Sequence, residues 1–176
     1  GWNNGVNEMP GEGSSNGTAS IPREMRLENG RLLMTPAEEM RLLEESPADV
    51  QGKAGGLKGY RLEAELPENF KGIFYLAQNE YQKVTLTIDG NVIKLNTGKE
   101  EDACVFHGES YIKDLDVFVD RSLIEIFVNK GAHTCTRRYY LAGQEDGISF
   151  DFESDKKVKS LTVKPMKGIF GREKYL

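Results

Sequence analysis

Hydrophobic and polar residues alternate in short runs along most of this chain, and the clearest run is Leu123–Asn129. The odd-numbered positions of this run hold Leu, Glu, Phe and Asn, and the even-numbered positions hold Ile, Ile and Val. This is the period of two expected of a β-strand, whose successive side chains point to opposite faces of a sheet. Because both sets contain large apolar residues, we expect an interior strand that is covered on both faces.

Further short runs predict an antiparallel, all-β protein. Alternate positions from Tyr60 to Leu66 are apolar and the intervening ones are polar, which is typical of a half-buried strand. Turn residues at Asp89-Gly90 and at Asn129-Lys130-Gly131 indicate hairpins. The other expected strands cover residues 72–77, 83–89, 91–96, 112–119, 134–141, 148–153 and 158–164. We therefore predict a two-sheet antiparallel β-sandwich of the jelly-roll or concanavalin-like kind.

The N-terminal part of the chain has a different pattern. Residues 2–20 are rich in Gly, Asn and Ser and cannot build a core of their own. Asn29-Gly30 between two apolar runs predicts a short hairpin, because this pair tolerates positive φ. Thr35-Pro36 followed by Glu38 resembles a capping box, so we expect one linker helix that ends near Ser46-Pro47. The predicted units are a hairpin region at 1–34, a linker at 35–55 and a sandwich domain at 56–176.

Composition and charge indicate a chain with its own core and argue against nucleic-acid and membrane partners. The chain has 176 residues, of which 38% are hydrophobic and 29% charged, and this is enough for a core of its own. A net charge of −5 without a basic stripe argues against nucleic acid as a partner. No apolar run approaches the roughly 20 residues that a membrane helix needs, so we expect no membrane partner.

The cysteines and histidines give no metal-ligand spacing. Cys104 and Cys135 could be bridged only if the strands that carry them lie side by side, and we prefer two free thiols. His107 and His133 stand apart from any paired ligand and are interpreted as strand or surface residues. We therefore expect no metal and no cofactor.

Two groups of motifs resemble one known family. Ser20–Glu24, Leu27–Leu32 and Pro36–Glu39 resemble the junction of glycoside hydrolase family 32, where the last propeller strands run into a linker helix. Asp120-Arg121-Ser122 with Glu125–Asn129 resembles the hallmark of that family's C-terminal sandwich. Gly1-Trp2 and Arg137–Tyr139 add to the match in the same order. The resemblance implies that residues 1–34 are the remnant of the last propeller blade.

Family 32 enzymes are β-fructofuranosidases such as invertases, sucrose-6-phosphate hydrolases and levanases, and they act with retention on terminal fructose. That chemistry needs two carboxyl groups about 5 Å apart. In the family they lie in Asn-Asp-Pro and Glu-Cys segments of the propeller, with a further Asp in an Arg-Asp-Pro segment, and none of these segments occurs here. The resemblance implies an intact hydrolase whose catalytic propeller is the partner of this chain. We expect no catalytic residue and no hydrolysis in the chain itself.

Few residues are candidates for a site. Trp2 is a candidate for the rim of the substrate cleft, and Asp120, Arg121, Ser122 and Glu125 are interpreted as a structural hallmark. Alternation places Asp114, Asp116 and Asp120 on one side of a strand and its end, and we interpret them as a solvated face, not as a catalytic or calcium site.

Two alternative functions remain open. One is a carbohydrate-binding sandwich, which would need exposed aromatic residues on one face. The other is an oligomerisation module, because the orphan strand at residues 2–24 offers unpaired backbone groups to another copy. The compartment is also open, with a bacterial cytoplasm preferred slightly to secretion.

Overall fold

The computed structural model describes residues 19–48, 53–98, 104–120, 122–141 and 148–168. Almost all regular structure in these ranges is β. The elements are β1 (Arg23–Glu28), β2 (Arg31–Pro36), the 3-10 helix η1 (Glu38–Leu43), β3 (Lys53–Leu57), β4 (Tyr60–Glu65), β5 (Lys71–Gln78), β6 (Lys83–Asp89), β7 (Val92–Asn96), β8 (Cys104–His107), β9 (Asp114–Val119), β10 (Leu123–Val128), β11 (His133–Arg138), β12 (Ile148–Ser154) and β13 (Ser160–Pro165).

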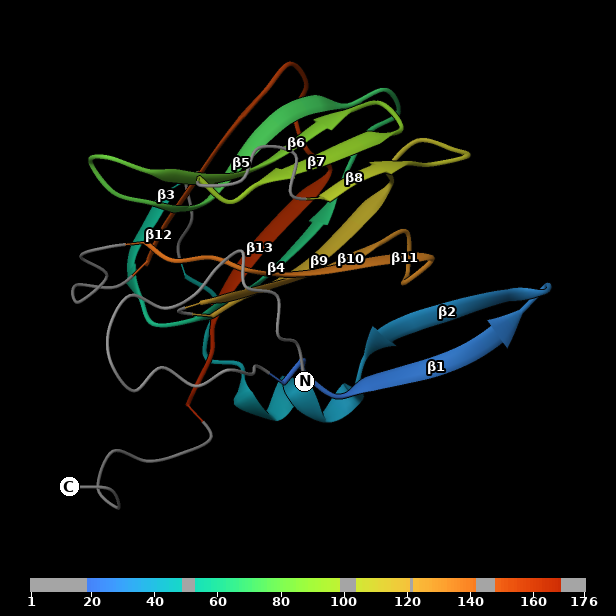
Figure 1. The fold of residues 1–176 in the computed structure, drawn as a ribbon, viewed down its shortest axis with the longest axis horizontal. Helices are drawn as coiled ribbons and strands as arrows, with labels where there is room; N and C mark the ends of the chain where they lie inside the picture. The colour runs from blue at the N-terminus through green and yellow to red at the C-terminus, as the bar shows by residue number, and fades with distance from the viewer. Residues whose placement is uncertain (1–18, 49–52, 99–103, 121, 142–147, 169–176) are drawn as a thin grey trace.

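The strands after η1 form two sheets that face each other, and every strand pair in them is antiparallel (Figure 1). One sheet has the order β11-β10-β9-β4-β13 and the other the order β3-β12-β5-β6-β7-β8. The predicted β-sandwich is therefore confirmed. Within the described ranges no helix is long and apolar enough to span a membrane.

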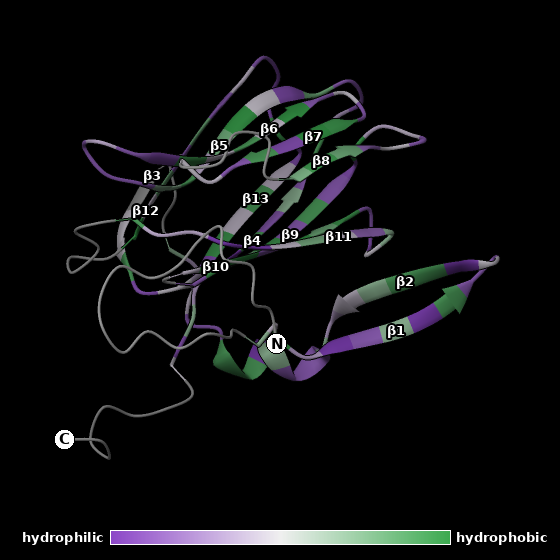
Figure 2. Ribbon diagram, in the orientation of Figure 1, coloured by the Kyte–Doolittle hydropathy of each residue, from purple (hydrophilic) through white to green (hydrophobic). Residues whose placement is uncertain are grey.

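The main core lies between the sheets and follows the alternation of the sequence (Figure 2). Tyr60, Leu62 and Ala64 of β4 are buried there, as the pattern predicts. Tyr60 also links the two layers, because its hydroxyl donates a hydrogen bond to the Leu76 carbonyl of β5 at 2.6 Å. Leu76 lies at an irregularity of the β5–β6 ladder between Tyr75 and Ala77, so the tyrosine satisfies a carbonyl at a break in the register.

Strand β10 is covered on both faces, as its two-sided apolar pattern predicts. Ile124, Ile126 and Val128 belong to the main core, whereas Phe127 joins Met40 in a second, smaller cluster. Met40 lies on η1, so the outer face of β10 is covered by the linker. A strand of this kind needs apolar residues on both faces because neither of them contacts water.

The hairpin β1–β2 projects from the sandwich, and its turn has positive φ at Asn29 and Gly30, as predicted (Figure 1). The predicted capping box is wrong. Thr35 and Pro36 finish β2, the residue before η1 is Ala37, and the Glu38 N–H donates to the Glu24 carboxylate at 3.2 Å. The cap therefore comes from the neighbouring strand, which local sequence spacing cannot reveal.

Two strands were not predicted. β3 lies in a glycine-rich stretch, and β8 is short and lies next to charged residues. Each of them is an edge strand of the six-stranded sheet. Edge strands need less apolar alternation than interior ones, because one side of the backbone has no neighbouring strand.

Candidate functional site

The most elaborate set of polar contacts lies where the linker meets the outer face of the five-stranded sheet. We call this region the linker junction; it consists of the bases of β1 and β2, η1, and the facing side chains of β4, β9, β10, β11 and β13. Its apolar part is the small cluster of Met40, Phe118 and Phe127. The guanidinium groups of Arg23 and Arg61 lie 5.1 Å from the ring centroids of Phe127 and Phe118, respectively. Such cation–π contacts hold both guanidinium groups against an apolar surface.

Glu125 holds the start of β1 to the sandwich. Its side chain is 1% exposed, and its Oε1 accepts a hydrogen bond from the Ile21 N–H at 2.6 Å. Its Oε2 accepts from the Arg23 guanidinium and from the Thr136 hydroxyl. Arg23 also donates to Thr136 Oγ1. A buried carboxylate requires such partners, because an unpaired charge in this position would be strongly destabilising.

A second contact fixes the base of β2. The Met34 N–H donates to the Gly131 carbonyl at 2.9 Å, in the turn between β10 and β11. Gly131 has a φ of +82°, and a Cβ at this position would collide with the Met34 carbonyl. Asn129 steadies the same turn by accepting the Lys113 N–H at 2.8 Å and donating to the Tyr111 carbonyl at 3.2 Å. Only glycine therefore allows the hairpin to approach this closely.

A charged cluster around Arg61 joins the linker to three strands. Arg61 binds Asp116 through two parallel hydrogen bonds of 2.8 and 2.7 Å and also donates to Glu44. Lys164 donates to Glu44 at 2.7 Å and to Glu63 at 2.9 Å. Burial alone would raise the pKa of Glu44, but the hydrogen bonds from Lys164 and Arg61 outweigh it and lower that pKa below its usual value. Glu44 is therefore ionised and bound at neutral pH.

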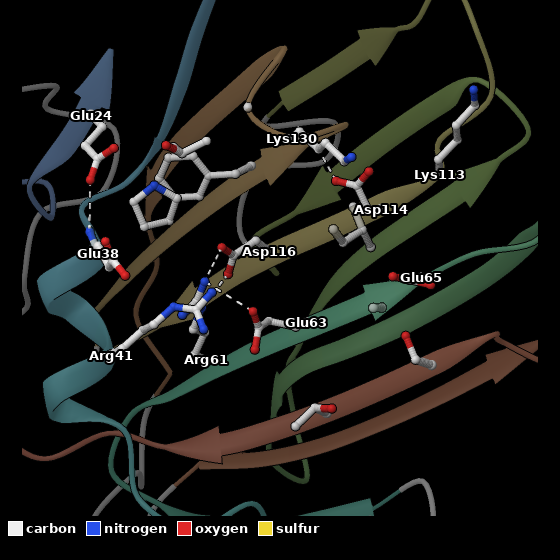
Figure 3. A pocket seen from close by; sticks show the side chains of 18 of the residues that line it. Glu24, Glu38, Arg41, Arg61, Glu63, Glu65, Lys113, Asp114, Asp116 and Lys130 are labelled. Carbon is white, nitrogen blue, oxygen red and sulfur yellow. Dashed lines mark hydrogen bonds and ion pairs between the residues drawn. The ribbon is translucent and has the colours of Figure 1, made fainter. Parts of the chain in front are cut away.

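A cavity of about 790 Å³ lies between the hairpin, η1 and the sheet, and charged side chains line much of it (Figure 3). Its carboxylates are largely engaged with the protein itself. Asp116 and Glu63 face Arg61, Glu24 accepts the Glu38 N–H, and Asp114 accepts the Lys130 N–H at 2.7 Å. Groups of both charges, held in hydrogen bonds, are suited to fixing one segment on another.

The structure places the predicted site residues in different regions. Asp120 and Ser122 lie in the turn between β9 and β10, where the Tyr139 hydroxyl donates to the Asp120 carbonyl at 2.6 Å and the Tyr139 N–H to the Ser122 carbonyl at 3.1 Å. Glu125 lies in the linker junction. Trp2 and Arg121 fall outside the described residues.

The aspartates predicted as a solvated face do not behave alike. Asp116 is only 21% exposed and bound to Arg61, so that interpretation is wrong for this residue. Sequence reasoning also missed Arg61, Glu44 and Gly131 as parts of the junction. Alternation marks Arg61 as outward-facing, but it does not show that the linker covers that outward face.

Solved structures of family 32 proteins share this fold. The structure superposes on a glycoside hydrolase of family 32 from Bifidobacterium adolescentis with a TM-score of 0.69 and 22% identity, covering 85% of this chain and 26% of that one. For a sucrose-6-phosphate hydrolase from Lactobacillus gasseri the TM-score is 0.65 and the identity 21%, with coverages of 84% and 33%. At these identities the likeness establishes the fold alone.

Sequence relatives point in the same direction. The chain is 25% identical to a sucrose-6-phosphate hydrolase of Streptococcus mutans, covering 75% of this chain and 30% of that protein. It is 26% identical to a sucrose-6-phosphate hydrolase of Vibrio alginolyticus, covering 88% and 32%. The chain thus spans about a third of the length of these curated relatives. Residues 61–165, more than half of the chain, match the model of the C-terminal region of glycosyl hydrolases of family 32, and the chain belongs to that family.

Proposed function

We propose that this chain is the non-catalytic C-terminal part of a β-fructofuranosidase and that it supports the catalytic propeller of the same protein through the hairpin β1–β2. The intact protein hydrolyses terminal β-fructofuranosyl bonds in sucrose, sucrose-6-phosphate or a fructan. Residues 1–34 complete the last propeller blade, 35–55 form the linker, and 56–176 form the supporting sandwich. Membership of the family and the length of the relatives support a larger parent protein.

The observation that carries the proposal is the apolar face of the hairpin. Met25, Leu27 and Leu32 are 69%, 75% and 52% exposed. Leu27 pairs directly with Leu32 and Met25 with Met34, so these side chains share one face. The opposite face carries Glu24, Arg26 and Thr35, which line the cavity beside the sandwich.

Such a hairpin is marginal on its own. Two strands without a third, or without a covered apolar face, have little independent stability in water. A contiguous exposed apolar face is typical of an interaction surface. The linker junction fixes the base of the hairpin to the sandwich, and the apolar face is then presented to the remaining part of the protein. The sandwich thereby stabilises the propeller and shapes the rim of its cleft.

The chemistry of hydrolysis comes from the propeller. A retaining mechanism needs a nucleophilic carboxylate and a second carboxyl group about 5 Å away that acts first as acid and then as base. The coding sequence before Gly1 is expected to encode the propeller, with an Asn-Asp-Pro, an Arg-Asp-Pro and a Glu-Cys segment in that order along the chain. A parent sequence without them would contradict the proposal.

The test uses the uninterrupted protein encoded by the longer coding sequence. We expect Leu27→Glu to lower its melting temperature and its rate of sucrose or sucrose-6-phosphate hydrolysis, because a charge enters an apolar contact. The matched control is Tyr81→Glu, since Tyr81 is 90% exposed but lies on the sandwich. Equal effects of the two variants would refute the docking role of the hairpin. Hydrolysis by the purified 176-residue chain, lost when one of its own acids is replaced, would refute the non-catalytic role.

The same apolar face supports self-association of the isolated chain. Part of the predicted orphan strand, residues 2–18, falls outside the described residues, so the hairpin is the surface to test. We expect light scattering of the isolated chain to detect dimers that Leu27→Glu abolishes, and monomers at all concentrations would exclude this partner.

Carbohydrate is the remaining partner to test. Tyr81 and Tyr111 are exposed aromatic residues, on separate loops. Titration with levan, inulin and sucrose decides this point, and the absence of binding heat would remove carbohydrate as a ligand of the sandwich.

A further inference from the structure

The open side of the sandwich brings two cysteines together from different sheets. β8 is an edge strand of the six-stranded sheet and β11 an edge strand of the five-stranded sheet. The rings of Phe106 on β8 and His133 on β11 lie 3.7 Å apart. Cys104 lies two residues before Phe106 and Cys135 two residues after His133, so each cysteine is on the same face of its strand as the ring. Both are half-buried, and both pack against the main core.

Each of the two thiols changes the pKa of the other. A hydrogen bond from the Cys135 thiol lowers the pKa of Cys104 to about 7, against the opposing effect of burial. The positive charge of Arg137 lowers the pKa of Cys104 further. The same hydrogen bond raises the pKa of Cys135. One thiol is thus a partly ionised nucleophile near neutral pH, and its neighbour holds the proton.

We propose that Cys104 and Cys135 form a redox-active dithiol that a low-molecular-weight disulfide oxidises to a bond between β8 and β11. The Cys104 thiolate attacks one sulfur of the small disulfide, an S–S bond to Cys104 forms, the original S–S bond breaks, and one thiolate leaves with the electron pair. Cys135 then loses its proton to the solvent and attacks the Cys104 sulfur, and the second small thiolate leaves. Two protein thiols are oxidised and one small disulfide is reduced to two thiols.

The bond would join the two sheets on a side where no strand ladder connects them in the described ranges. The sulfur atoms of a disulfide are about 2.05 Å apart, so the two edge strands have to bring the sulfur atoms to this distance for the bond to form. The closed loop restricts the unfolded chain, and we expect the melting temperature to rise by about 5–10 °C on oxidation.

The experiment treats the purified chain with oxidised glutathione at pH 8 and compares it with the chain kept in dithiothreitol. We expect intact mass to fall by two hydrogen atoms, free thiols to disappear, and peptide mapping to find Cys104 joined to Cys135. Iodoacetamide should alkylate Cys104 with a midpoint near pH 7, and this midpoint should rise in Cys135→Ala, which lacks the hydrogen-bond donor. Cys135→Ser, whose hydroxyl keeps a donor at this position, is the matched control and can form no internal disulfide.

The outcome separates a dithiol from two independent thiols. Glutathione attached to both cysteines, without an internal bond, would overturn the proposal. A Cys104 midpoint that is the same in wild type and Cys135→Ala would overturn the coupling between the thiols. Cys104→Ser is expected to form no internal bond and to lose the oxidative rise in melting temperature.

Discussion

Replacing Glu125 with glutamine is expected to release the linker from the sandwich without unfolding the sandwich. The glutamine oxygen can still accept the Ile21 N–H, but its amide group then faces the Arg23 guanidinium, donor against donor. A hydrogen bond to a charged group contributes about 1.5–3 kcal/mol, and breaking a buried ion pair costs about 3–5 kcal/mol. We therefore expect the linker junction to lose about 3 kcal/mol, which is on the order of a 100-fold increase in its opening equilibrium.

Hydrogen exchange measures this opening directly. In Glu125→Gln the amides of Ile21 and Met34 should lose protection, because their acceptors lie across the junction. The amide of Leu86, in the buried centre of β6, should keep its protection. Glu65→Gln is the matched control, since Glu65 is an exposed carboxylate on the outer face of β4.

A double-mutant cycle tests directly whether Arg23 and Glu125 are energetically coupled. Arg23→Met should be destabilising because it leaves Glu125 buried with fewer partners, whereas Arg23→Met combined with Glu125→Met should recover part of the loss. Additive effects of the two substitutions would show that the pair is not coupled. Unchanged exchange at Ile21 in Glu125→Gln would refute the role of Glu125 in holding the linker.

Three further predictions concern single contacts. Gly131→Ala should detach the base of β2, because its Cβ would collide with the Met34 carbonyl; amide exchange at Met34 tests this, and normal protection would contradict it. Tyr60→Phe should lower the free energy of unfolding in urea by about 1–2 kcal/mol, because the Leu76 carbonyl loses its donor, and no loss would exclude a role of this bond. Because the pKa of Glu44 is lowered in the fold, its ion pairs stabilise the folded state at pH values above the usual pKa of glutamate. This stabilisation is lost as the pH falls through the lowered pKa. Urea unfolding below about pH 4.5 should therefore weaken wild type more than Glu44→Gln, and parallel pH profiles would contradict this assignment.

The sequence by itself determined the sandwich, most of its strands and the hairpin turn. These features depend on alternation and on turn residues, which act over a few neighbouring positions. The two apolar faces of β10 even predicted that something covers its outer side. Sequence could not show that this cover is η1, nor that Glu24 and not Thr35 caps it, because the contact joins segments that are distant along the chain.

Only the tertiary structure decided the roles of the polar residues. Glu125 belongs to a recognisable motif, but its hydrogen bonds to Ile21 and Arg23 span about 100 residues of sequence. Arg61 and Asp116 look like ordinary outward-facing charges until the linker covers them. The placement of Cys104 and Cys135 depends on how two edge strands from different sheets meet. Alternation specifies which face a side chain occupies, whereas the segment that lies opposite that face is fixed by the arrangement of the whole chain.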